Sequence, residues 1–547
     1  MTSTSTSRTQ TAERPWFADA VIYQVDPNLF ADSDGDGHGD LRGLTARLEH
    51  VRDLGATCVW ILPFYGTPYR DGGYDVSDHR TVDPLFGTME DLDRLVARAH
   101  ELGLHVMTEL VVQHTSDQHR WFRQARRDPG SPYRDYYVWA DHPEETDVEP
   151  IFPGVEDSVW AWDQAAGRYY RHLFYSHEPD LDLSRDVVRE EIAEVADLWL
   201  DHGVDGFRVD AVPSIIERTR AADPTDHGLW WLDELRDHVE SRHPEIVLMG
   251  EVDEQPEEYV GYFGGNHRLN LILNFWINNH VFLALARGEA GPIVDALEHQ
   301  PDPPPGARYA NWLRNHDELD LERLTDAERA EVFAAFAPEP EMQLYGRGIR
   351  RRLSPMLGGD DRWEALAHAV MLSLPGVPVL RYGDEVGQGE DLSRPERTAV
   401  RTPMQWTGGR NAGFSESVDG LAAPLVTAGI FDYRRRNVAD QERDPASLLH
   451  RIRAMVQARR SLPETTGRTC RPLDVGASSV LALHHGADGG PGVVLLANLS
   501  AEPAVAELSA ALPGEEVLAD EVSRELAADG DRLPVAGHGY RWLRVRS

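Results

Sequence analysis

The stretch that decides the fold is Gly206-Phe207-Arg208-Val209-Asp210, a short apolar run that ends in a carboxylate. Two other stretches have the same form, Val247-Leu248-Met249-Gly250-Glu251 and Leu313-Arg314-Asn315-His316-Asp317. Short apolar runs of this length are typical of buried strands. We therefore predict that each terminal carboxylate lies at the carboxyl end of a strand, and that parallel strands bring the three carboxylates to one face of a barrel.

Similar apolar runs recur from residue 20 to residue 390 and alternate with stretches of helical spacing. The predicted strands lie at 21–25, 59–62, 105–112, 206–210, 247–251, 271–274, 309–314 and 377–382. The predicted helices lie at 44–54, 92–102, 192–199 and 232–239. Eight strands alternating with helices predict an α/β fold, specifically a (β/α)8 TIM barrel.

Other segments depart from this alternation. Residues 115–185 are aromatic and acidic with little periodicity, which predicts a subdomain inserted after the third strand. Residues 320–365 separate strands seven and eight and contain the run Arg350-Arg351-Arg352. Because loops at the carboxyl face of a barrel build its site, both insertions are expected to wall it. The predicted units are a disordered tail at 1–15, the barrel at 16–114 and 186–460, the inserted subdomain at 115–185 and a C-terminal β-sandwich at 461–547.

Charge and composition exclude several classes of function. The chain has 547 residues and a formal net charge of −38, and all 54 of its basic residues are arginine. Such a surface repels nucleic acid and anionic membranes. Without lysine the chain has neither Schiff-base chemistry nor a P-loop.

The N-terminus and the cysteines indicate a cytoplasmic protein. The tail is rich in Ser and Thr and lacks the apolar core of a secretion signal. No stretch approaches the roughly 20 apolar residues that span a bilayer. Cys58 lies inside the apolar run 58–62, which predicts a buried free thiol and a reducing compartment.

Five motifs in a fixed order carry a resemblance to a known family. Gly72-Gly73-Tyr74-Asp75 follows strand two, Val111-Val112-Gln113-His114 ends strand three, and the three carboxylate motifs follow. With these motifs the chain resembles the α-amylase superfamily of retaining glycosidases and transglycosidases over nearly its whole length. Within that superfamily it is similar to the maltose–trehalose mutases, the trehalose synthases, at residues 108–119, 206–213, 314–319 and 348–353.

The resemblance implies a role for each carboxylate. In a retaining mechanism one carboxylate attacks the anomeric carbon and another protonates the leaving oxygen, with about 5–5.5 Å between them. Asp210 is then the nucleophile, and Arg208 is expected to lower its pKa and keep it ionised. Glu251 is the acid/base, which needs a raised pKa. Asp317 binds sugar hydroxyls and stabilises the oxocarbenium-like transition state.

The resemblance also implies a set of substrate-binding residues. His114 and His316 are expected to donate to sugar hydroxyls. Asp75 and Arg401 are expected to pair and close the pocket beyond the non-reducing end. The full predicted set is Tyr74, Asp75, His114, Arg208, His316, Glu318 and Arg401.

The acidic loop at residues 32–40 predicts a calcium site, with magnesium as the alternative, because it offers oxygen ligands at alternating positions. It begins like an EF-hand loop but has Gly43 where a glutamate is needed. The predicted ligands are Asp32, Asp34, Asp36, His38 and Asp40. A second site is predicted from Gln113, Asp180 and Glu217. No organic cofactor is expected.

Some residues depart from the trehalose synthase pattern beside the pocket. Gln113 replaces an asparagine, Glu178 and Asp182 replace Gln and Asn, and 252–254 reads Val-Asp-Glu where Ala-Asn-Gln is usual. These changes leave the substrate open. The alternatives are a mutase that interconverts maltose and trehalose, an α-glucosidase or α-amylase that hydrolyses short α-glucosides, and a non-catalytic carbohydrate-binding protein, which the intact carboxylates disfavour. The sequence is compatible with a homo-oligomer.

Overall fold

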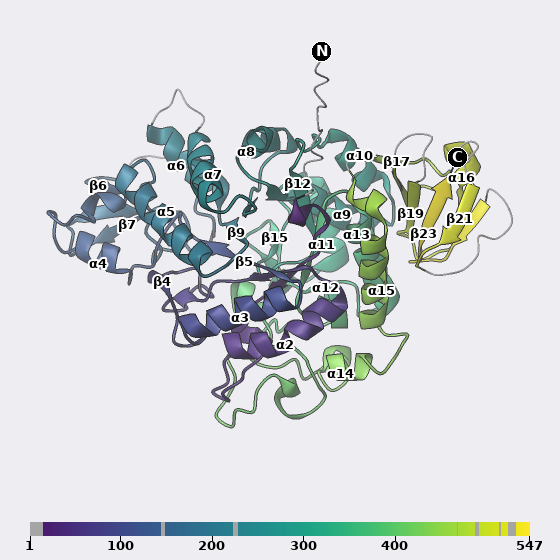
Figure 1. The fold of residues 1–547 in the computed structure, drawn as a ribbon, viewed down its shortest axis with the longest axis horizontal. Helices are drawn as coiled ribbons and strands as arrows, with labels where there is room; N and C mark the ends of the chain where they lie inside the picture. Colours follow the sequence, from purple (N-terminus) through teal and green to yellow (C-terminus); the bar gives the residue numbers. More distant parts are fainter. Residues whose placement is uncertain are drawn as a thin grey trace, which may run out of the picture.

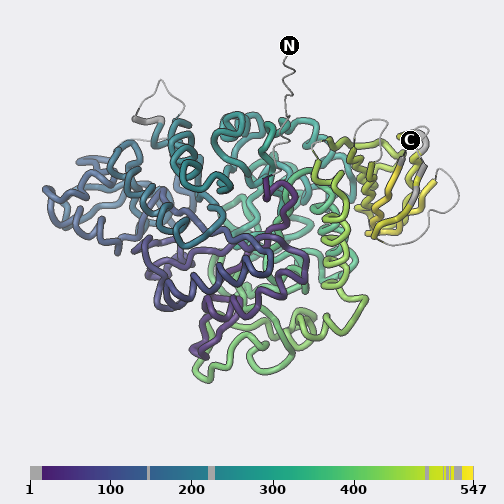
Figure 2. Tube along the Cα trace, in the orientation of Figure 1, coloured from purple at the N-terminus to yellow at the C-terminus, as the bar shows by residue number. Residues whose placement is uncertain are grey.

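A computed structural model describes residues 15–143, 148–222, 228–467, 469–486, 492–512, 516–522 and 532–546. The predicted disordered tail lies outside the described residues, apart from Pro15. A barrel occupies the middle of the molecule, with the 115–185 insertion at one end and the C-terminal strands at the other (Figure 1, Figure 2). Within the described residues we find no helix with both the length and the apolar character that a membrane span requires.

Eight parallel strands close into the barrel, and each one pairs with the barrel strands that precede and follow it along the chain. They are β1 (Ile22–Val25), β2 (Cys58–Ile61), β5 (His105–Leu110), β9 (Gly206–Val209), β10 (Val247–Gly250), β11 (Leu271–Leu273), β12 (Arg308–Trp312) and β16 (Val377–Arg381). Each lies within, or within a residue of, a predicted strand. The predicted α/β fold class, a TIM barrel, is therefore confirmed.

The four predicted helices are present and are longer than the sequence pattern indicated, and capping residues set the start of two of them. Asp40 caps α2 (Leu41–Leu54) by accepting a hydrogen bond from the Gly43 backbone N–H at 2.7 Å. Thr88 and Asp91 form a reciprocal capping box at the start of α3 (Met89–Glu101). The other two predicted helices are α5 (Asp186–Asp201) and α7 (Trp230–Arg242).

Further helices complete the molecule. They are α1 (Pro27–Phe30), α4 (Arg120–Ala125), α6 (Val212–Ala222), α8 (Tyr259–Phe263), α9 (Phe275–Arg287), α10 (Gly291–His299), α11 (Asp326–Phe336), α12 (Leu353–Met356), α13 (Asp361–Ser373), α14 (Val438–Gln441), α15 (Leu448–Ser461) and α16 (Leu508–Ala511).

The barrel interior is apolar through its middle and polar at the carboxyl ends of the strands. Alternate strand residues point inward, and they form an apolar cluster that includes Ile22, Cys58, Trp60, Met107, Met249, Trp312 and Val379. Two residues further along the same strands the inward positions are polar: Gln24, Glu109, Glu251 and Arg381. The apolar core therefore ends where the polar site begins.

Two insertions lie at the carboxyl end of the barrel. In the first, β6 (Trp139–Ala140), β8 (Arg168–Arg171) and β7 (Trp160–Asp163) form a three-stranded sheet. In the second, the strands β13 (Leu319–Asp320), β15 (Gly348–Ile349) and β14 (Gln343–Leu344) form another. A two-stranded ribbon, β3 (Tyr65–Gly66) with β4 (Asp78–Val82), follows barrel strand β2.

The C-terminal strands form two antiparallel sheets. The first has the order β17 (Cys470–Pro472), β18 (Val480–His485), β19 (Gly492–Asn498), β23 (Tyr540–Arg546) and β21 (Glu516–Asp520), and the second pairs β20 (Ala504–Glu507) with β22 (Arg532–Val535). Side chains of both sheets share one apolar core, which includes Val480, Leu496, Ala506 and Leu533. The predicted boundary residues between the units stay predictions. Cys58 is buried, and both cysteines are free thiols.

Candidate active site

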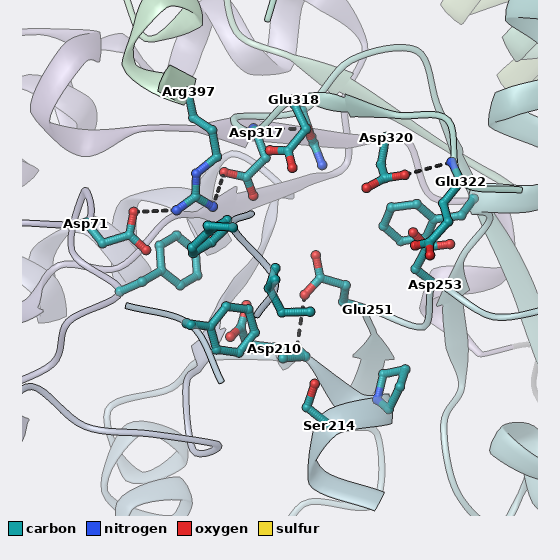
Figure 3. A pocket seen from close by; sticks show the side chains of 18 of the residues that line it. Asp71, Asp210, Ser214, Glu251, Asp253, Asp317, Glu318, Asp320, Glu322 and Arg397 are labelled. Atoms are coloured by element: carbon teal, nitrogen blue, oxygen red, sulfur yellow. Dashed lines mark hydrogen bonds and ion pairs between the residues drawn. The ribbon is translucent and has the colours of Figure 1, made fainter. Parts of the chain in front are cut away.

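The pocket that holds the three predicted carboxylates opens at the carboxyl ends of the barrel strands. Figure 3 shows Asp210 and Glu251 near one another, with Asp317 facing them across the pocket. The predicted site residues that line it are Tyr74, His114, Asp210, Glu251, Asp317 and Glu318. The structure therefore brings together the carboxylates that lie far apart in the sequence.

Arg208 joins the predicted nucleophile to the predicted acid/base. Asp210 follows β9 directly and Glu251 follows the neighbouring strand β10 directly. One guanidinium nitrogen of Arg208 lies 2.5 Å from Asp210 Oδ1, and another lies 2.6 Å from Glu251 Oε1. Ala211 turns the chain with a φ of +48°, and its backbone N–H donates to Glu251 Oε2 at 2.9 Å. Both carboxylates are thus fixed by the strand that carries the nucleophile.

Burial sets the protonation of these two carboxylates. It raises the pKa of Glu251 to about 7, because the negative charge of Asp210 adds to desolvation and together they outweigh Arg208. Burial also raises the pKa of Asp210, although Arg208 opposes the shift. We predicted that Arg208 lowers the pKa of Asp210; this is one part of the balance, and desolvation is the larger part. A raised pKa suits Glu251 to donate a proton near neutral pH.

Glu109 is a site residue that the sequence analysis did not assign. Its carboxylate accepts hydrogen bonds from Trp60 Nε1 at 2.9 Å and from the Tyr74 hydroxyl at 3.0 Å, and it lies 2.9 Å from Arg208 Nη1. Burial raises its pKa to about 7, with Arg208 opposing. Glu109 therefore helps to fix the Arg208 guanidinium that pairs with Asp210 and Glu251. Strand parity could have found it, since it lies two residues beyond the inward-facing Met107.

Asp317 is surrounded by positive charge. Its Oδ1 lies 3.0 Å from Arg397 Nη1 and 2.8 Å from Arg401 Nη2, and the His316 ring lies 3.1 Å from its Oδ2. Burial opposes ionisation, but His316 and the two arginines hold the pKa of Asp317 well below its usual range. Asp317 is therefore anionic at any working pH, as a group that stabilises a cationic transition state needs to be.

The ion pair that lines the pocket is different from the predicted one. Arg397 Nη2 lies 2.7 Å from Asp71 Oδ1, so this guanidinium bridges Asp71 and Asp317, as Figure 3 shows. The predicted pair of Asp75 with Arg401 does not form.

Both predicted partners are engaged elsewhere. Asp75 is fully buried and accepts hydrogen bonds from the Arg70 and Asp71 backbone N–H groups and from the Thr67 hydroxyl. Arg401 binds Asp317 and the His316 carbonyl. Asp71 lies four residues before Asp75 in the sequence, and Arg397 lies four residues before Arg401.

Of the remaining predicted sugar-binding residues, Tyr74, His114 and His316 are buried and Glu318 is partly buried. The rings of Tyr74 and His316 stack with centroids 5.2 Å apart. The two ring nitrogens of His114 lie 2.9 Å from Gln113 Oε1 and 3.2 Å from the Tyr74 carbonyl oxygen. Burial lowers the pKa of both histidines. Burial raises the pKa of Glu318 to about 7. Their contact with sugar stays a prediction.

The predicted calcium loop brings three of its five residues together. One carboxylate oxygen each of Asp32, Asp34 and Asp40 lie within 4.8 Å of one another. No arginine or histidine within the described ranges forms an ion pair with them, so a cation would offset their mutual repulsion and the set fits calcium. Asp36 instead accepts from the His38 backbone N–H, and the His38 ring bonds Asn28.

A segment distant in the sequence, residues 414–422, forms hydrogen bonds with this loop. The Asp32 backbone N–H donates to the Phe414 carbonyl, the Ser415 hydroxyl donates to Asp32 Oδ2, and Ala422 donates to Gly37. Figure 2 shows the two segments side by side at one edge of the barrel.

In the second predicted metal set, the carboxylate oxygens that would bind a metal pair with an arginine side chain. Arg171 Nη1 lies 2.5 Å from Asp180 Oδ2, and its Nη2 lies 3.2 Å from Glu217 Oε1. Gln113 Oε1 is engaged by His114. The guanidinium supplies the positive charge that a cation would have supplied, so these residues do not fit a second metal.

Of the residues that depart from the family pattern, Asp253 lines the pocket, and Gln113 and Glu178 lie next to His114, which also lines it. Asp253 lies 3.0 Å from Arg323. Glu178 is fully buried, and its carboxylate lies 3.9 Å from the rings of His114 and His177. Burial raises the pKa of Glu178 well above its usual range.

Comparisons with known proteins place this geometry in context. Residues 24–321 and 350–466 match the model of the "Alpha amylase, catalytic domain" family. A trehalose synthase/amylase of Mycolicibacterium smegmatis is 39% identical over 561 residues, covering 99% of this chain and 94% of the relative. A trehalose synthase of Pimelobacter sp. is 38% identical, covering 97% of this chain and 96% of the relative. The crystal structure of an α-glucosyl transfer enzyme superposes with a TM-score of 0.78 at 30% identity, covering 97% of this chain and 100% of that one.

Proposed function

The chain belongs to the α-amylase family, and we propose that it interconverts maltose and trehalose by moving one glucosyl group within the bound sugar. Two relatives whose names include trehalose synthase align with it over nearly their whole length. The three carboxylates to which we assign the chemistry, Asp210, Glu251 and Asp317, line one pocket. The substrate class is short α-glucosides.

The bridge from Asp71 through Arg397 to Asp317 is the observation that carries this proposal. It closes the pocket beside the transition-state carboxylate, and the Arg397 guanidinium lies over the Phe152 ring at 4.6 Å. An end closed beyond the non-reducing glucose admits one glucosyl unit on that side of the bond that is cleaved. This favours transfer of a terminal glucosyl group over cleavage inside a polymer.

The first chemical step forms a covalent glucosyl-enzyme. A carboxylate oxygen of Asp210 attacks the anomeric carbon of the terminal glucose and forms a bond to it. The bond from that carbon to the glycosidic oxygen breaks, and Glu251 gives its proton to the departing O4 of the second glucose. Asp317 stabilises the positive charge that develops on the ring between these events.

The second step reverses the first with a different hydroxyl. The freed glucose turns in the pocket and presents its own anomeric hydroxyl. This oxygen forms the new bond to the glucosyl carbon, Glu251 takes its proton, and the bond to Asp210 breaks. Two inversions retain the α configuration of the transferred glucose. The α anomer of the freed glucose supplies the hydroxyl, so the product is the α,α-linked disaccharide, trehalose.

Hydrolysis is the second candidate function. Water would take the place of the freed glucose, with the same transfer of its proton to Glu251, and the product would be glucose. The Mycolicibacterium relative, named trehalose synthase/amylase, favours keeping this alternative, as do the altered residues Gln113, Glu178 and Asp253 beside the pocket.

The test is to incubate the protein with maltose in the presence of isotopically labelled free glucose. We expect trehalose as the main product, with a smaller amount of glucose and little label in the trehalose, because the freed glucose stays in the pocket. Heavily labelled trehalose would mean that glucose exchanges with solvent. Glucose as sole product would leave hydrolysis as the function.

We also propose that a calcium ion, or magnesium in its place, binds Asp32, Asp34 and Asp40 and stabilises the fold. A chelator is then expected to lower the melting temperature by several degrees, since an ion at about a hundredfold its Kd contributes ~2.7 kcal/mol. Calorimetry with and without chelator measures this. Asp34→Asn is the matched variant: it should melt lower in calcium and respond less to chelator. A chelated, ion-free protein with an unchanged melting temperature would exclude the site.

The cellular setting is proposed from composition. The protein is expected to act in the cytoplasm on small sugars, since its two cysteines are free thiols and its net charge of −38 repels nucleic acid and anionic membranes. A homo-oligomer stays a prediction.

A further inference from the structure

Three segments that are far apart in the sequence meet over the pocket, and we call them the roof. They are the turn between β14 and β15 (residues 345–347), residues 151–152 of the first insertion, and residues 396–397. Ile151, Phe152, Arg347 and Arg397 all line the pocket. The chemistry described above uses only Arg397 among them.

Arg347 fastens the turn to both walls of the pocket. Its Nε donates to Asp320 Oδ2 at 2.6 Å, and its Nη2 donates to the Ile151 carbonyl at 3.0 Å. The same Nη2 lies 4.0 Å from Glu318 Oε1. Asp320 is three residues beyond Asp317, whereas Ile151 belongs to the insertion after β5. One guanidinium therefore connects the transition-state side of the pocket to the inserted subdomain.

Tyr345 fastens the same turn to the third segment. Its hydroxyl donates to Glu396 Oε2 at 3.1 Å, and its ring lies 5.1 Å from the Phe152 ring. Glu396 also accepts from the Tyr175 hydroxyl at 2.6 Å. The residue after Glu396 is Arg397, which closes the far end of the pocket.

Both residues of this contact have an uncommon backbone conformation. Tyr345 has a φ of +55° and Glu396 a φ of +42°, in the left-handed region that L residues with a side chain rarely occupy. Such conformations cost of order 1–3 kcal/mol each and persist only where surrounding contacts impose them. For Tyr345 the conformation is that of the tight turn itself, in which Gly346 has a φ of +72° and the Arg347 backbone N–H donates to the Leu344 carbonyl at 3.3 Å. Glu396 is held by the bonds that it accepts from the Tyr345 and Tyr175 hydroxyls. The side-chain contacts of Arg347 and Tyr345 therefore join the turn to the other two segments of the roof.

We infer that Arg347 is a specificity-determining residue: by holding the roof shut between the two chemical steps, it decides whether the glucosyl group passes to glucose or to water. This inference rests on the proposed function and deepens it. With the roof open, a water oxygen bonds to the glucosyl carbon, Glu251 takes the water proton, and the bond to Asp210 breaks, releasing glucose. With it closed, the trapped glucose takes the place of water.

The test compares two arginine variants on the product ratio. Arg347→Met keeps the aliphatic stem and removes both hydrogen bonds. Arg329→Met is the matched control, because Arg329 lies in the same insertion, has 21% of its side chain exposed against 18% for Arg347, and also bonds backbone carbonyls and an aspartate. Arg329 does not line the pocket.

The measurement is glucose formed per trehalose formed at equal consumption of maltose. We expect this ratio to rise about tenfold or more in Arg347→Met, because the loss of even one of its two charge-assisted hydrogen bonds from the closed state would change the ratio by that amount. The control should keep the wild-type ratio. A purely structural role would lower both products together and leave the ratio unchanged, and equal ratios in the two variants would overturn the inference.

Tyr345→Phe provides an independent variant if Arg347→Met does not fold. It removes the bond to Glu396 and keeps the ring against Phe152, so we expect a smaller rise in the same ratio. An unchanged ratio in a folded Tyr345→Phe protein would count against the roof. Failure of the proposed function is distinguishable, because it would appear as a wild-type protein that makes glucose and no trehalose.

Discussion

Replacing Asp210 by alanine is expected to lower the rate of maltose conversion by about 10⁴-fold or more, the order of loss seen when a covalent nucleophile is removed. The reason is geometric: Asp210 lines the pocket at the end of β9, and Arg208 fixes it 2.5 Å away. Initial rates of disaccharide conversion measure the effect. A rate within tenfold of wild type would remove Asp210 from the role of nucleophile.

The stability of this variant provides the control. Burial raises the pKa of Asp210 in the folded state. A carboxyl group whose pKa rises on folding opposes folding increasingly as the pH rises through the folded pKa. Arg208 keeps Glu109 and Glu251 as partners after the substitution. We therefore expect the free energy of unfolding of Asp210→Ala at neutral pH to equal or exceed that of the wild type, so that lost activity cannot be assigned to lost fold.

Strand parity explains why the central site could be predicted from the sequence. In a barrel, inward positions recur every second residue, so the inward-facing Met249 fixes Glu251 two residues later, at the mouth of the barrel. The strands that precede Asp210 and Glu251, β9 and β10, are adjacent in the barrel, so the two carboxylates lie close together. The same argument applied to Met107 would have found Glu109.

Loop contacts could not be predicted in this way. The closing pair is Asp71 with Arg397, and the sequence analysis chose Asp75 with Arg401. Loops have no periodic pattern that orients a side chain, so choosing among neighbouring aspartates required knowing that backbone N–H groups already satisfy Asp75.

The contact of Arg171 with the second predicted metal set could not be foreseen for a related reason. Carboxylate spacing does not reveal whether an arginine distant in the sequence pairs with the same carboxylates.

Replacing Glu251 by glutamine is expected to separate substrates by their leaving groups. Glutamine cannot donate the proton that the sugar oxygen of maltose needs, and general acid catalysis contributes roughly 10²–10⁴-fold. We expect a loss of that size with maltose. An activated aryl glucoside has a leaving group that departs without a proton, so its glycosylation step should slow far less. Equal losses for the two substrates would exclude Glu251 as the acid.

The pH profile gives the second part of this prediction. Glu251 must be protonated to act as the acid, and burial raises its pKa to about 7. The wild-type kcat/KM for maltose is therefore expected to fall as the pH rises through about 7, since kcat/KM reports the free enzyme. This alkaline fall should be absent in Glu251→Gln, whose side chain does not titrate.

Two neighbouring carboxyl groups make the assignment of that fall testable, because burial raises the pKa of Glu109 and of Glu318 to about 7 as well. Glu109→Gln and Glu318→Gln are the matched controls: each removes one titrating carboxyl group and leaves Glu251 in place. Their absolute rates will differ from wild type, since both residues contact the site, but each should keep the alkaline fall. If the fall disappears in Glu318→Gln and persists in Glu251→Gln, the proton that limits the reaction belongs to Glu318, and the acid role must be moved across the pocket.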